Sequence, residues 1–137
     1  MKLLDANVFL YATGREHPYK QASISLLSMT QQGTLAATTD VEVFQEILHL
    51  HQSRDQAAFG IALVEEALAS FPDALPITAG TIVAAVDILH RYEIVEARDA
   101  IHAAVVFENN LEGIISADGG LDAISGLVRF DPKELAK

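Results

Sequence analysis

Four carboxylate side chains of this sequence occupy positions that are unusual for acids on a solvated surface. Asp5 ends a short apolar run, and Asp118 closely follows another. Glu46 borders the apolar stripe of a helical segment, and Asp99 lies in the first turn of a helical segment that is apolar on every side. Taken singly, each acid can be explained as a helix cap, an acid favoured by the helix dipole or a boundary residue. Taken together, the four acids indicate a site.

The chemistry that these four acids share is the binding of a divalent cation. Two unit charges about 5 Å apart at an effective dielectric constant of about 20 repel each other by roughly 3 kcal/mol. A cluster of acids therefore needs protonation, a basic partner or a cation. The chain has no Cys, and oxygen ligands favour Mg²⁺ or Mn²⁺ over zinc. A carboxylate cage that holds one or two such ions is a site for phosphodiester cleavage.

Short strands that alternate with helices are expected to position these acids. The strands are expected near residues 3–4, 35–38, 113–116 and 127–130, with a weak one at 75–77; helices are expected from Val8 onward and over 19–32, 41–52, 56–71, 81–92 and 98–109. This alternation predicts an α/β fold of three layers, α/β/α, with a central parallel sheet. Ligands of such folds bind beyond the carboxyl ends of the strands. Asp5 and Asp118 both lie at strand ends, so we expect them at the same edge of the sheet.

Length and charge narrow the class of protein further. The chain has 137 residues, half of them apolar, which predicts a single domain over residues 1–137. Nine Lys and Arg residues against nineteen Asp and Glu give a net charge of −10, which disfavours a general nucleic-acid-coating protein. No apolar run approaches the roughly 20 residues that span a bilayer, and early charges exclude a signal-peptide core. We therefore expect a cytoplasmic protein that does not enter membranes.

Four segments that contain the acids resemble, in order, the motifs of the PIN-domain nucleases. The segments are LLDANVF at 3–9, VEVFQEIL at 41–48, RDAIHAA at 98–104 and IISAD at 114–118. One such motif alone is a weak signal, but the ordered set extends over residues 3–122 and is specific. The small single-domain form is most similar to the VapC toxins of bacterial and archaeal toxin–antitoxin pairs.

The resemblance implies an Mg²⁺-dependent endoribonuclease that hydrolyses RNA with a metal-activated water, Mn²⁺ being an alternative ion. It also implies a homodimer and a cognate antitoxin protein bound over the active site. Carried over residue by residue, it implies that the catalytic and metal-binding acids are Asp5, Glu46, Asp99 and Asp118, and that Asn7 and Ser116 orient these acids or bound water.

One departure from the family pattern leaves the fourth acid open. The family often has an aromatic residue three positions after this acid, where the chain reads Gly119-Gly120-Leu121-Asp122. Asp122 therefore stands beside Asp118 as an alternative fourth acid.

Other polar residues have a functional and an ordinary interpretation. Arg15, His17, Lys20 and Arg98 are candidates for contacts to the RNA backbone, and ordinary solvated charge is the alternative for Arg15 and Lys20. We expect His102 to be a hydrogen-bonded core histidine rather than a metal ligand.

Two other functions remain open, a non-catalytic PIN-like domain that binds a partner and a housekeeping RNA-processing nuclease. A receiver-like phosphoacceptor domain is disfavoured because none of the four Lys residues is placed at a strand end as it requires. We also expect Phe9, Tyr11, Phe44 and Phe107 to be core residues rather than platforms for bases.

Overall fold

A four-stranded parallel sheet forms the centre of the computed structural model, which describes residues 1–137. Its strands, in the spatial order β2-β1-β3-β4, are β1 (Lys2–Leu4), β2 (Ala37–Thr38), β3 (Gly113–Ile115) and β4 (Arg129–Phe130). Strands β1 and β3 are parallel neighbours, with Leu4 opposite Ile115 at their carboxyl ends. The residues that follow these two strands therefore meet at one edge of the sheet.

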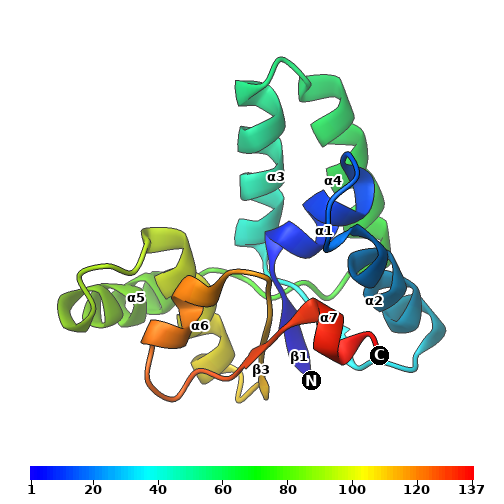
Figure 1. Cartoon of the computed structure of the whole chain (residues 1–137). Helices are drawn as coiled ribbons and strands as arrows, with labels where there is room; N and C mark the ends of the chain where they lie inside the picture. The colour runs from blue at the N-terminus through cyan, green and yellow to red at the C-terminus, as the bar shows by residue number, and fades with distance from the viewer.

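Helices cover both faces of this sheet (Figure 1). They are α1 (Ala6–Thr13), α2 (Lys20–Gln32), α3 (Val41–Ser53), α4 (Ala57–Ser70), α5 (Ala79–Arg91), α6 (Ala97–Glu108) and α7 (Pro132–Leu135), with a 3₁₀ helix η1 (Gly119–Ala123). Helices α5 and α6 pack together on one side, and α1, α2 and α7 lie on the other. Helices α3 and α4 form a pair that extends beyond the carboxyl edge of the sheet. No helix is both long and apolar enough to cross a lipid bilayer.

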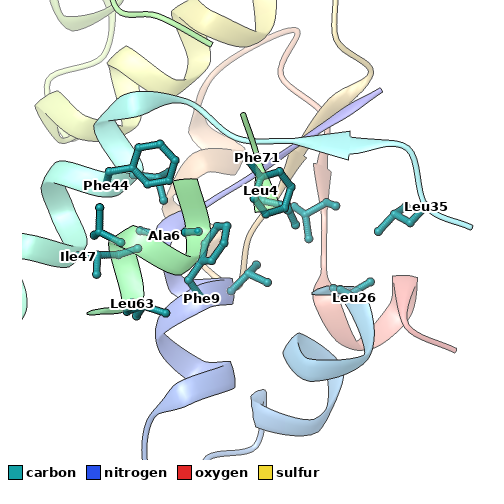
Figure 2. Close-up of a cluster of buried hydrophobic side chains, with 14 residues drawn as sticks. Leu4, Ala6, Phe9, Leu26, Leu35, Phe44, Ile47, Leu63 and Phe71 are labelled. Carbon is teal, nitrogen blue, oxygen red and sulfur yellow. The ribbon is translucent and has the colours of Figure 1, made fainter. Parts of the chain in front are cut away.

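Alternation along the strands divides the core between the two helical layers. Leu3 and Ile114 point into the cluster built with α5 and α6. Leu4 and Ile115 point the opposite way, into the cluster built with α1 to α4 that Figure 2 shows. In that cluster Phe9 meets Phe71 edge-to-face, with ring centroids 5.7 Å apart. The two clusters fix β1 and β3 from both sides and so hold their carboxyl ends in place.

The predicted three-layer α/β/α fold with its parallel sheet is therefore confirmed, with local differences. Residues 119–123 form a 3₁₀ helix where a turn was expected. Helix α7 was not predicted; Asp131 caps it by accepting a hydrogen bond from the Lys133 backbone N–H. The expected strand at 75–77 is reduced to a single bridge between Leu75 and Asp40.

The aromatic residues expected in the core divide into two groups. Phe9 and Phe44 are buried as predicted. Phe107 is 42% exposed and Tyr11 is only half-buried, so the expectation for these two was wrong. Helix α6 thus reaches solvent at its last turn, and α1 presents an aromatic ring at the surface.

Candidate active site

Asp5 lies at the carboxyl end of β1 and is held by donors from three directions. Its Oδ1 accepts a hydrogen bond from the Ala6 backbone N–H at 2.7 Å, so it also caps helix α1. Its Oδ2 accepts hydrogen bonds from Ser116 Oγ at 2.6 Å and from Asn7 Nδ2 at 3.2 Å. Burial raises the pKa of Asp5, and the nearby His102 and the Ser116 hydroxyl act in the opposite direction. The structure thus brings Asn7 and Ser116, the two predicted orienting residues, into contact with Asp5.

Glu46, from α3, is held by a buried histidine from α6. His102 lies 2.8 Å from Glu46 Oε1 through its Nε2, and 2.7 Å from Asp40 Oδ2 through its Nδ1. Both ring nitrogens face carboxylate oxygens, an arrangement that a protonated imidazolium satisfies because both nitrogens then donate. Asp5 Oδ1 also lies 3.6 Å from the Nε2 atom. His102 is therefore the basic partner on this side of the acidic cluster.

The electrostatics of His102 agree with this geometry. Burial by itself lowers the pKa of His102, but hydrogen bonds with Asp40 and Glu46, together with the charges of Asp40 and Asp5, raise it well above its ordinary 6.5. The prediction of a hydrogen-bonded core histidine is confirmed, since the side chain is fully buried. One ligand atom each from Asp5, Glu46 and His102 lie within 4.8 Å of one another. Since carboxylates engage both ring nitrogens, however, the imidazole offers no free lone pair to a cation.

Asp99 and Asp118 form the other side of the cluster, where no histidine or lysine pairs directly with either carboxylate; the more distant charge of His102 only partly offsets the rise in the pKa of Asp99. Asp99 lies in the first turn of α6, and no N–H or O–H group of the protein donates to it within hydrogen-bonding distance. Asp118 follows β3 and accepts a hydrogen bond from the Gly120 backbone N–H through its Oδ1, at 2.8 Å. Burial, followed by the charges of Asp118 and Asp5, raises the pKa of Asp99 from 3.8 to about 7.

All four predicted acids line one pocket of about 180 Å³ at the carboxyl edge of the sheet. Arg98 is the only Arg or Lys in its lining, and this side chain donates to Glu96 at 2.9 Å. Glu46 Oε2, Asp118 Oδ2 and both oxygens of Asp99 accept no hydrogen bond from an N–H or hydroxyl group of the protein, and the Asp99 and Asp118 carboxyls lie close enough to share a hydrogen bond when one of them is protonated. This donor set fits a hard divalent cation such as Mg²⁺, which prefers carboxylate oxygen and retains several water ligands.

The alternative fourth acid, Asp122, is engaged elsewhere. Arg129 donates to its two carboxylate oxygens at 2.9 and 3.1 Å, and the Asp122 side chain is exposed. Asp122 does not line the acidic pocket, whereas Asp118 does. The structure therefore favours Asp118 as the fourth acid. The hydrogen bonds from Arg129 lower the pKa of Asp122.

The predicted RNA-contact residues lie at different distances from this pocket. Arg98 lines it, and Arg15 and His17 line a neighbouring groove. Lys20 donates to the carbonyl of Gly14 at 2.7 Å, so its ammonium holds the loop after α1 together.

Asp40 is the site residue that sequence reasoning missed. It caps helix α3, because its Oδ1 accepts a hydrogen bond from the Val43 N–H at 3.2 Å. Its second oxygen binds His102, which lies 62 residues away in sequence. Nothing in local spacing indicates that contact.

Comparison with known proteins identifies the family. The sequence profile of the PIN domain matches residues 2–127. The chain belongs to the PIN domain family. Ribonuclease VapC13 of Mycobacterium tuberculosis (strain ATCC 25618 / H37Rv) is 32% identical over 130 residues, which cover 95% of this chain and 99% of the relative. Ribonuclease VapC7 of the same strain is 29% identical over 136 residues, 96% of this chain and 92% of the relative. These matches support the assignment of the chain as a nuclease, a hydrolase.

Chains in two solved structures, one of VapBC2 and one of a toxin–antitoxin complex, share the fold. VapBC2 from Rickettsia felis, bound to a promoter DNA fragment, aligns with a TM-score of 0.73 at 14% identity, over 94% of this chain and 96% of that one. A toxin–antitoxin complex from Klebsiella pneumoniae aligns with a TM-score of 0.68 at 17% identity, over 96% and 98% of the two chains. At these identities the likeness concerns the fold alone.

Proposed function

We propose that this PIN-domain protein is an Mg²⁺-dependent endoribonuclease and the toxin of a toxin–antitoxin pair. The observation that carries the proposal is the convergence of Asp5, Glu46, Asp99 and Asp118 in one pocket. These acids come from separate segments of the chain, and several of their oxygens have no protein partner. The relatives named as VapC ribonucleases and the neighbours that are toxin–antitoxin complexes support the choice of substrate and biological role.

The residues of the pocket have two roles: some would bind the cation, and others position the carboxylates that bind it. Bound Mg²⁺, or Mn²⁺ in its place, would polarise a phosphate oxygen and lower the pKa of the attacking water. Ser116 and Asn7 fix the Asp5 carboxylate through their hydrogen bonds, and His102 fixes Glu46. The free oxygens of Asp99 and Asp118 are available to hold the cation or to orient the water and accept its proton. No nucleophilic side chain is required: water would add to the phosphorus as the P–O3′ bond breaks, leaving a 5′-phosphate and a 3′-hydroxyl.

The test of this function is cleavage of single-stranded RNA with and without Mg²⁺ or Mn²⁺. We expect the wild-type chain to cleave only with the ion, and Asp5→Asn and Asp99→Asn to lose more than about 100-fold in rate. Asp122→Asn is the matched control, since Asp122 is an exposed acid that does not line the pocket. Equal activity in all four proteins would exclude the nuclease function and favour a non-catalytic, partner-binding domain.

The toxin role separates this protein from a housekeeping RNA-processing nuclease. The toxin role predicts a short neighbouring reading frame for a DNA-binding protein with a basic tail. An Arg from that antitoxin would pair with the carboxylates of the pocket in the bidentate geometry that guanidinium groups prefer. Growth arrest on expression, relieved by the neighbouring protein and absent in Asp99→Asn, would support this role.

We also propose that the chain forms a homodimer through α5. Ile82, Val83 and Val86 share one side of this helix at helical spacing and are 42%, 70% and 46% exposed. Contiguous exposed apolar side chains of this kind are typical of protein interfaces. Val83→Asp should convert the dimer to a monomer in sedimentation experiments, and a wild-type monomer would contradict the proposal.

A further inference from the structure

Two arginines stand apart from all the other cationic side chains of this acidic protein. Six of the nine Lys and Arg residues lie within 4.0 Å of a carboxylate oxygen: Lys2, Lys20, Arg91, Arg98, Arg129 and Lys137. A seventh, Lys133, lies over the ring of Tyr19 at 4.6 Å. The remaining two, Arg15 and Arg54, have no acid within that distance, and their guanidinium groups donate no hydrogen bond to the protein.

Arg15 and Arg54 line the same groove. This groove, called here the Arg15–Arg54 groove, has a volume of about 520 Å³ and runs between α1 with its following loop and the end of α3. It shares Asn7 and Leu10 with the acidic pocket, so the two hollows adjoin. A further hollow of about 300 Å³ is lined by the same two arginines and continues to Phe59. A continuous depression therefore leads from the carboxylates to the two free cations.

Aromatic rings stand beside these cations in the groove. The rings of Tyr11 and His17 stack with centroids 4.1 Å apart and an angle of 12° between their planes. The loop that carries His17 is held in place, because Lys20 Nζ donates to Gly14 O at 2.7 Å and the Tyr19 N–H donates to His17 Nδ1 at 3.1 Å. His17 is exposed and backed by Tyr11, so it offers a flat ring at the surface.

We propose that the Arg15–Arg54 groove binds the single-stranded RNA segment that adjoins the scissile phosphate. This inference rests on the proposed ribonuclease function. Arg15 and Arg54 contact backbone phosphates of that segment, and His17, backed by Tyr11, stacks on one of its bases. A cationic groove with aromatic platforms is the general means by which proteins hold single strands.

The two arginines beside an acidic pocket, together with the stacked rings, favour RNA over an acidic peptide as the occupant of the groove. A chain of net charge −10 repels RNA at a distance, so local cations must retain the strand beside an acidic pocket. An acidic peptide would also suit the two arginines, but it would leave the stacked rings of Tyr11 and His17 unused, whereas RNA bases stack on such rings. Glu16 is the only acid that lines the groove.

The test separates binding of the RNA strand in the groove from cleavage at the acidic pocket. The double variant Arg15→Gln/Arg54→Gln is compared with Lys133→Gln/Lys137→Gln, which removes the same charge at helix α7 and the chain end. Each is assayed on a single-stranded RNA of about 12 nucleotides, within the range that single-strand-binding folds cover, and on a dinucleotide too short to reach the groove. Binding of the longer RNA is measured in an Asp99→Asn background with chelator, where no cleavage interferes.

We expect the arginine variant to raise KM for the longer RNA about tenfold and to leave dinucleotide cleavage unchanged. The slope of log affinity against log salt should fall by about 1.4, which is about 0.7 for each lost phosphate contact. His17→Ala should weaken binding at least about fivefold without a change in slope, because stacking involves no counterion release.

Two results would overturn the inference. The first is that the arginine variant binds the longer RNA with the same affinity and the same salt slope as the lysine control. The other is an equal loss on the dinucleotide, which would show that the arginines act on the site itself. Arg54 lies at the C-terminus of α3, where a positive charge stabilises the helix through its dipole. Melting temperatures are therefore compared to confirm that the variants are folded. The binding arm remains decisive if wild-type protein fails to cleave, a result that would refute the proposed function alone.

Discussion

The two sides of the acidic pocket differ in how the negative charge of their carboxylates is balanced. On the side of Asp5 and Glu46, buried carboxylates are matched by His102 and by the hydroxyl of Ser116. On the side of Asp99 and Asp118, no side-chain donor plays that part, and the pKa of Asp99 rises to about 7 because of burial and its acidic neighbours. The first side is complete within the protein, whereas the second is complete only with a proton or a cation.

This difference indicates which half of the site is scaffold and which half responds to ligand. The histidine fixes the position of Glu46 before any ion arrives, so binding does not have to order that side chain. In the proposed cation site, Asp99 and Asp118 would supply the binding energy, because a cation would relieve repulsion that folding imposes.

Removal of His102 should have the largest effect on stability. His102→Leu leaves Asp40 buried without its partner, and breaking a buried charged pair in this way costs about 3–5 kcal/mol. Chemical denaturation of His102→Leu, Asp40→Asn and the double variant measures the coupling between them. The double variant should lose less unfolding free energy than the sum of the two single variants, because it leaves no unpaired buried charge at either position. Strictly additive losses would mean that the two side chains are not coupled.

Loss of the Ser116 hydroxyl should cost an intermediate amount. Ser116→Ala removes the 2.6 Å hydrogen bond to Asp5 and leaves the Asp118 N–H without its acceptor. Buried groups left unsatisfied cost about 1–3 kcal/mol. Ser53→Ala is the control, because its exposed hydroxyl donates only to a carbonyl of its own helix. Equal unfolding free energies for the two variants would refute the role given to Ser116.

On the unmatched side, Asp99→Asn should stabilise the protein in the presence of chelator. The unfolded carboxyl ionises near pH 3.8 and the folded one near pH 7, so wild-type stability falls as pH rises between these values. The gain of the variant should therefore be absent near pH 4 and complete above pH 7. After a discount for partial exposure it amounts to about 1–2 kcal/mol. Thermal melts at several pH values measure it, and a variant that melts below wild type at pH 8 would contradict the crowding of acids.

Asp122→Asn should have the smallest effect, in the range of about 0–1 kcal/mol, because exposed ion pairs contribute little. The partner, Arg129, retains its hydrogen bond to the Ser116 carbonyl at 3.0 Å. A loss comparable to that of His102→Leu, measured by the same denaturation, would show that the pair with Arg129 is structurally essential.

Local pattern predicted the fold and the convergence of acids, because both follow from strand ends. Asp5 and Asp118 lie at the ends of adjacent parallel strands, and the apolar runs that end there are visible in the sequence. The resemblance to the family added the roles of Glu46 and Asp99. The link from Asp40 to His102 could not be predicted, since it depends on how α3 and α6 pack rather than on spacing within either helix.

The groove beside the pocket was also beyond sequence reasoning. Arg15 and Arg54 are distant in sequence, and ordinary solvated charge was the preferred explanation of Arg15. Tyr11 was expected in the core, yet the loop after α1 turns back and stacks His17 on its ring. Only the placement of that loop against α3 gathers these residues.

Titration of Mn²⁺ into the metal-free protein, followed by calorimetry, tests the central claim most directly. The account predicts that wild type and Asp122→Asn bind the ion with the same affinity, and that Asp99→Asn binds it at least about tenfold more weakly. Equal Mn²⁺ affinity in wild type and Asp99→Asn would contradict a cation site built on these four acids.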